Sequence, residues 1–191
     1  MSSELKSHGF VEYSFDFKRV GYLRTVKGSG TLLLRETGAF LLDVNVPQEG
    51  RYVLRYEHEV LAELIQSDKK TLYKVYSSPQ QLELSFAFVA LKNLKYGVRS
   101  AITTLRDKYN VTLKGSEFSL KPKIETEILK SLEIKQEDGA LQLSLSFRSG
   151  DLLTQDVFIT AVLSKKVVDK KTAAQRFILD IPANASVLKA N

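Results

Sequence analysis

Apolar and polar residues alternate along most of the chain, which is the pattern of β-strands that bury one face. The alternation indicates about ten short strands, with the clearest runs at 11–17, 40–46, 51–56, 82–88, 141–147, 157–163 and 177–181. Glycine-containing turns are expected at 28–30, 36–38, 138–139 and 149–151. Short, evenly spaced strands are typical of sandwiches and barrels. The predicted fold class is therefore mainly β, an antiparallel β-sandwich or barrel.

One pair of strands has a recognisable connection, Pro47-Gln48-Glu49-Gly50. Proline presets φ for a turn and glycine can take a positive φ, so the runs on either side are predicted to form a hairpin. We expect Val46 to lie near Arg51 and Val44 near Val53. The stretch 40–56 looks like the strand–turn–strand of jelly-roll carbohydrate-binding and extracellular sandwich modules, and covers under a tenth of the chain.

One segment breaks the alternation and repeats its apolar positions every three or four residues. These positions predict an amphipathic helix near 90–109, with Gly97 on the polar face and Asn110 as its stop. They are Leu91, Leu94, Val98, Ala101, Ile102, Leu105 and Tyr109. Residues 124–132 fit either a second, shorter helix after Pro122 or a strand, and residues 59–66 fit a helical turn.

The composition is that of an ordinary globular protein: 191 residues, 43% apolar and 26% charged. We expect a frayed lead-in at 1–9 and a single β-rich domain at 10–191, or alternatively two β-subdomains divided near 91–123. The chain has no cysteine, which excludes disulfides, thiolate catalysis and cysteine metal sites. The first residues lack the apolar core of a secretory signal. The expected location is therefore cytoplasmic, or in an intracellularly assembled particle, rather than secreted.

The net charge of +6 is concentrated in residues 92–123, where eight basic residues face only Asp107 and Glu117. A stripe along the predicted helix flanks its apolar face and is the candidate contact for an anionic partner, either nucleic acid or an anionic membrane surface. Its residues are Lys92, Lys95, Arg99 and Arg106, and Lys108 is added to the candidate contact. The alternative is a solvated face with no partner. A second basic group, Lys165, Lys166, Lys170 and Lys171, is expected on a long exposed loop between strands.

The sequence offers few groups for catalysis. Of the two histidines, only His58 has flanking carboxylates, and a histidine at a strand end is ordinarily just exposed. The glycine-rich 27–31 precedes a strand rather than a helix, so it predicts a hairpin and not a phosphate-binding loop. Glu12 and Asp16 share a strand face without further signs of a site. We therefore predict no catalytic residues, no metal, no cofactor and no enzymatic activity.

A β-rich chain without a visible site favours a structural or assembly module of the coat, tail or scaffold type, which acts through protein–protein contacts in a homo-oligomer or larger assembly. The first alternative is a binding module whose basic helix contacts nucleic acid or anionic lipid. The second alternative is a jelly-roll-like carbohydrate-binding module, as the resemblance of residues 40–56 implies.

Overall fold

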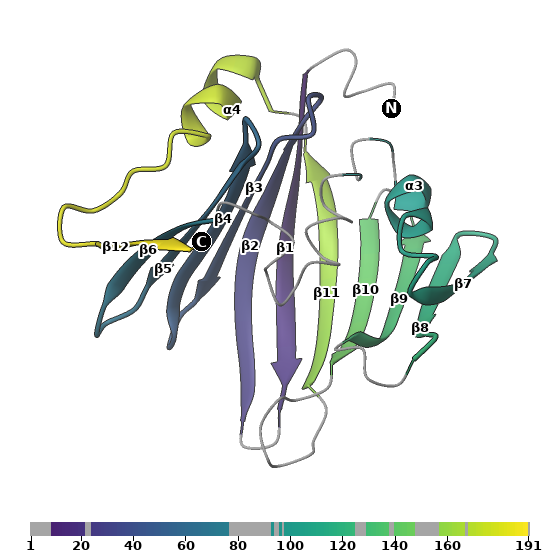
Figure 1. Ribbon diagram of the computed structural model, residues 1–191. Coiled ribbons are helices and arrows are strands. Elements are labelled where there is room, and N and C mark those ends of the chain that lie inside the picture. The colour runs from purple at the N-terminus through teal and green to yellow at the C-terminus, as the bar shows by residue number, and fades with distance from the viewer. Residues whose placement is uncertain are drawn as a thin grey trace.

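The computed structural model describes residues 9–21, 24–76, 93, 96, 98–124, 129–137, 140–147, 157–166 and 168–190. In these residues the chain forms one sheet of twelve strands, in the order β12-β6-β5-β4-β3-β2-β1-β11-β10-β9-β8-β7 (Figure 1). The strands are β1(Phe10–Val20), β2(Thr25–Arg35), β3(Phe40–Val46), β4(Gly50–Glu57), β5(Val60–Gln66), β6(Thr71–Tyr76), β7(Tyr109–Lys114), β8(Glu117–Pro122), β9(Leu129–Glu137), β10(Ala140–Phe147), β11(Val157–Lys166) and β12(Ser186–Ala190). The mainly β prediction is confirmed. The sandwich or barrel prediction is wrong, because all twelve strands share one open sheet whose end strands, β12 and β7, do not pair with each other.

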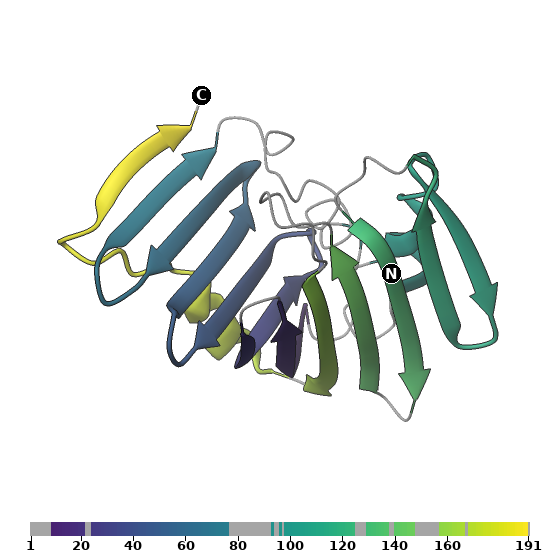
Figure 2. The same ribbon diagram turned by 90° about the horizontal axis from the view of Figure 1, so that it is seen from below.

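The sheet is bent into a trough. Figure 2 shows the end strands rising on both sides of the central strands β1, β2 and β11, with helix α4 (Lys170–Arg176) outside the trough. Neighbouring strands pair antiparallel, except β12, which runs parallel to β6. The strand register therefore assigns every side chain either to the concave face or to the convex face that carries α4.

Two glycines in the middle of β2 allow the sheet to bend. A Cβ atom at Gly30 would lie 2.5 Å from the Phe15 ring and 2.6 Å from the carbonyl oxygen of Asp43. At Gly28 the corresponding distances are 2.6 Å to the Phe17 ring and 2.7 Å to the carbonyl oxygen of Asn45. Glycine thus lets the aromatic rings of β1 cover β2 while β3 closes in from the other side. The predicted turn at 28–30 is therefore wrong, because these residues lie within a strand.

The chain after β11 forms a strap across the convex face, which we define as residues 168–190. Helix α4 begins at Asp169, whose carboxylate accepts a hydrogen bond from the Thr172 N–H at 2.9 Å. Ala173 and Phe177 are buried against the sheet, and the Phe177 ring lies 6.0 Å from that of Phe10. Strand β12 then pairs with β6 and completes the sheet. The strap therefore covers the apolar part of the convex face.

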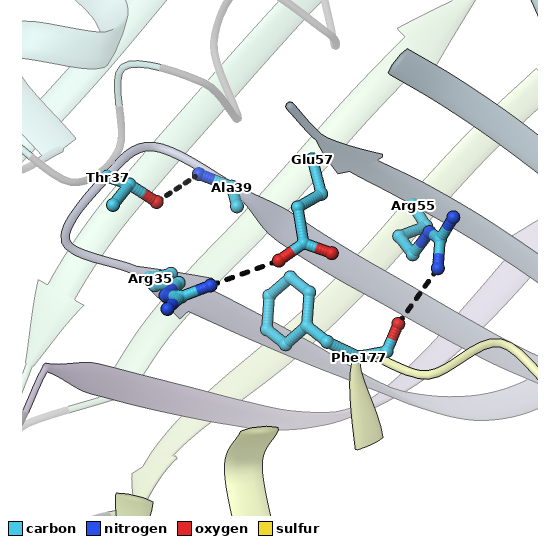
Figure 3. Close-up of polar contacts among 6 residues, drawn as sticks. All are labelled: Arg35, Thr37, Ala39, Arg55, Glu57 and Phe177. Atoms are coloured by element: carbon cyan, nitrogen blue, oxygen red, sulfur yellow. Dashed lines mark hydrogen bonds and ion pairs between the residues drawn. The ribbon is translucent and has the colours of Figure 1, made fainter. Parts of the chain in front are cut away.

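A hydrogen bond from the sheet holds this strap where α4 ends (Figure 3). The Arg55 guanidinium donates to the Phe177 carbonyl oxygen at 3.1 Å, and nearby Arg35 donates to Glu57 at 3.0 Å. The predicted strand at 177–181 is wrong, since Phe177 instead forms the C-terminal cap of α4. The loop expected between residues 165 and 176 is likewise largely a strand end and a helix.

On the concave face, the described residues show a helix shorter than the one expected at 90–109. Helix α3 spans Val98–Thr103 and continues through turns into β7. The predicted apolar face is confirmed at its C-terminal end, where Ala101, Ile102, Leu105 and Tyr109 are buried. Three of these side chains pack with Phe118, Leu120, Leu132, Ile134 and Leu163 of the sheet. The helix therefore covers the β7–β11 side of the trough.

The hairpin at residues 40–57 is confirmed, with Gly50 at a φ of 109°. Its register is one residue from the expectation, because Val46 pairs with Gly50 and Val44 with Tyr52. The helical turn expected at 59–66 is wrong. His58 and Glu59 both have positive φ values and form the tight turn between β4 and β5. Of the two alternatives for 124–132, the strand is correct from Leu129 onward.

Several expectations lie outside the described residues: the lead-in at 1–8, the strand at 82–88 and the turns at 138–139 and 149–151.

Candidate functional site

The concave face between β4 and β10 is lined by apolar side chains that are only partly buried. We call this set the concave row; its β1 and β3 members lie on either side of β2, which contributes Gly28 and Gly30 between them. Its members are Tyr13, Phe15, Phe17, Leu42, Val44, Tyr52, Leu143, Leu145 and Ala161. Fully buried clusters lie on both sides of it, one around Leu32 and Phe40 and one around Leu105 and Tyr109. The row is therefore the accessible part of an otherwise buried apolar face.

Aromatic side chains form the centre of this row. The rings of Phe15 and Phe17 have their centroids 6.4 Å apart and lie over the two glycines of β2. Burial raises the pKa of the neighbouring Tyr13 hydroxyl, as expected where the ionised form would lose water. The centre of the trough is thus lined by aromatic side chains.

A polar cluster on β4, β5 and β6 shares Tyr52 with the row and adds Glu63, Lys74 and Tyr76. Glu63 is only 8% exposed. Its carboxylate accepts a hydrogen bond from the Tyr76 hydroxyl at 2.6 Å and lies 3.4 Å from the Lys74 ammonium. Burial raises the pKa of the Tyr52 hydroxyl, and the negative charge of Glu63 raises it further. The row therefore ends at a buried carboxylate balanced by one ammonium group.

The convex face is polar at the same level of the sheet and holds a depression of about 830 Å³ beside α4. Arg176 reaches into it from α4, donating to the Glu12 carboxylate and to the Thr31 hydroxyl at 3.0 Å. Arg51 donates twice to Asp43, at 2.9 and 2.7 Å, and this hydrogen bonding raises the pKa of Arg51. Each guanidinium is thus already bound by a carboxylate of the sheet.

The structure separates the residues of the predicted basic stripe. Arg99 lies in α3, whereas Arg106 and Lys108 lie in the turns that follow, and all three are exposed. Lys92 and Lys95 lie outside the described residues. The second basic group is divided between the end of β11, with Lys165 and Lys166, and the first turn of α4, with Lys170 and Lys171. As a contact site, the stripe stays a prediction.

The other sequence candidates fall on ordinary structural positions. His58 is exposed in the turn between β4 and β5. Glu12 and Asp16 do share the convex face, as the alternation predicted, and Glu12 is the ion-pair partner of Arg176. In the described part of the chain, no group of three or more potential metal ligands is present.

Sequence reasoning missed the concave row because alternation shows that a strand has an apolar face but not what covers that face. The available signal was the pairing of two glycines in 25–35 with aromatic residues at the same spacing in 10–20. That combination is typical of a bent sheet.

No protein-family model matches this chain, and no curated protein matches it either. Solved structures resemble it in part. A DUF1329 family protein from Desulfovibrio piger has 9% identity and a TM-score of 0.37, with 85% of each chain covered. A LolA superfamily protein from Nitrosomonas europaea has 8% identity and a TM-score of 0.33, covering 83% of this chain and 84% of its own. A putative outer membrane lipoprotein-sorting protein domain from Vibrio parahaemolyticus has 7% identity and a TM-score of 0.37, covering 88% and 90%.

These comparisons contradict the predicted coat, tail or scaffold function and its nucleic-acid alternative. They also contradict the predicted homo-oligomeric assembly, the nucleic-acid partner and the cytoplasmic location. Those predictions assumed that every apolar strand face is fully buried in the core. They therefore looked for a partner only on the polar outer surface. The absence of enzymatic activity stays a prediction.

Among the residues that the structure describes, no helix is long and apolar enough to span a bilayer.

Proposed function

We propose that this protein is a non-catalytic binding protein that holds the apolar part of an amphipathic molecule, such as an acyl chain, in the trough of its sheet. The observation behind this proposal is the concave row. Nine partly buried apolar side chains on five strands share one face of the sheet between β4 and β10, whereas the convex face at the same level carries Ser14, Ser29, Thr31 and Asn45. Accessible apolar side chains gathered on one concave surface are typical of binding sites for apolar ligands.

The test compares two substitutions at adjacent residues of β3. Val44 belongs to the concave row, and Asn45 points to the convex face. Val44→Glu places a charge on the apolar surface, so we expect it to weaken binding of the neutral fluorescent probe N-phenyl-1-naphthylamine by about tenfold or more. Asn45→Glu adds the same charge to the convex face and should leave probe binding unchanged.

Binding is measured as the rise in probe fluorescence on titration, with circular dichroism confirming that both variants fold. The proposal fails if the wild-type protein does not bind the probe. It also fails if both variants bind the probe as the wild type does, because the site would then lie elsewhere.

A further inference from the structure

The polar cluster at the end of the concave row has a charge balance that selects between ligands. On the concave face of β1–β6, the described residues carry three charged side chains, Arg19, Glu63 and Lys74. Arg19 lies at the far end of β1 and is paired with Glu49 at 2.7 Å. Among the described residues of β1–β6, Glu63 and Lys74 are therefore the charged side chains that face the part of the trough adjoining Tyr52.

These two charges nearly cancel. The Lys74 ammonium is 3.4 Å from Glu63, its side chain is 30% exposed, and an ammonium group carries three N–H donors. The Glu63 carboxylate is 10% exposed and already accepts from Tyr76. A group that docks here meets hydrogen-bond donors without meeting net positive charge.

On this basis, and resting on the proposed function, we propose that the trough binds acyl compounds with an uncharged polar end, such as an ester or amide, in preference to free fatty acids. A carboxylate beside this pair would be attracted by Lys74 and repelled by Glu63 at similar distances. It would lose its hydration with little return. An ester or amide carbonyl loses less hydration and can still accept a hydrogen bond from Lys74.

The experiment uses cis-parinaric acid and its methyl ester, which share one fluorescent chain and differ only in the polar end. At pH 8, where the free acid is ionised, we expect the wild-type protein to bind the ester about tenfold more tightly than the acid. Glu63→Gln leaves Lys74 without its carboxylate partner, so the preference should disappear or reverse. Lys74→Met leaves Glu63 without its counter-charge, so the preference for the ester should increase.

The matched control is Glu57→Gln. Glu57 also carries an ion-paired carboxylate, held by Arg35 at 3.0 Å, but it lies on the convex face, so its replacement should leave the ester-to-acid ratio unchanged. If Glu63→Gln fails to fold, the opposite shift predicted for Lys74→Met still tests the inference.

Equal binding of the two probes by the wild type would overturn the inference, as would a ratio that neither Glu63→Gln nor Lys74→Met changes. In both cases the proposed function would stand, since the acyl chain of the probe would still be bound. If the protein bound neither of the two parinaric probes nor N-phenyl-1-naphthylamine, the proposed function would be refuted, and this inference would be refuted with it.

Discussion

Replacing Gly30 by alanine tests whether the bend of the sheet depends on that residue. The added Cβ atom would lie 2.6 Å from the Asp43 carbonyl oxygen and 2.5 Å from the Phe15 ring. A contact of this kind is ordinarily at least about 3.4 Å, so β3 must move away by roughly 0.8 Å. The ring can rotate, but the carbonyl belongs to the β2–β3 pairing, so the movement weakens that pairing.

The expected magnitude follows from two opposing effects. Overpacking of this kind costs about 1–3 kcal/mol, whereas exchanging glycine for alanine restricts the unfolded chain and returns about 0.4–1 kcal/mol. We therefore expect a net loss of about 1–2 kcal/mol in the free energy of unfolding. For a chain of this length that corresponds to a decrease in Tm of roughly 2–8 °C.

The assay is equilibrium unfolding in urea, with Gly21→Ala as the control. At Gly21 the nearest atom to an added Cβ would be 3.8 Å away, an ordinary contact, so this variant should be neutral or slightly stabilised. Should Gly30→Ala unfold within about 0.5 kcal/mol of the wild type, the bend would not depend on this glycine and the reasoning would be refuted.

Two further predictions concern the helices. Leu105→Ala removes a buried side chain between α3 and the sheet, so the free energy of unfolding measured in urea should fall by about 2–5 kcal/mol. Leu113→Ala, at a position 37% exposed, is the control and should cost far less. Equal losses for the two variants would contradict the packing. The hydrogen bond from Thr172 lowers the pKa of Asp169 below its ordinary value of 3.8, so the stability that this carboxylate adds is present above that pH and is lost as the pH falls through the lowered pKa. Asp169→Ala should therefore have a lower Tm than the wild type at pH 7 and the same Tm at strongly acidic pH, and a gap that persists there would contradict the assignment.

Local patterns in the sequence predicted many of the strands correctly. Strict alternation identified residues 11–17 and 40–46 as strands and assigned their side chains to the correct faces. The Pro47–Gly50 turn was found because proline and glycine restrict the backbone locally. Its register was one residue off, since the number of turn residues left unpaired depends on how the strands twist together.

Properties that depend on distant pairing were not predictable in the same way. Alternation is identical in a sandwich and in a bent single sheet, so nothing in residues 11–17 indicated whether Phe15 would meet a second sheet or a trough. The sequence analysis predicts a turn at Gly28 and Gly30. Both positions require glycine because the Phe15 and Phe17 rings of another strand lie against them, and local sequence does not show that contact. The concave row could be recognised only from the three-dimensional structure, because its residues come from strands that are far apart in the sequence.

The central position of β1 has a consequence for how the chain folds during synthesis. Glu12 is opposite Leu33 on one side and Lys166 on the other, so the two neighbours of β1 come from opposite ends of the sequence. The meander β1–β6 is complete once residue 76 has been made, but β11 is complete only at residue 166. At synthesis rates of about 5–20 residues per second, β1 waits roughly 5–20 s as an unpaired edge with aromatic side chains. A nascent chain that is interrupted before β11 would therefore expose this edge to aggregation, and a chaperone that shields residues 10–20 would raise the yield of folded protein.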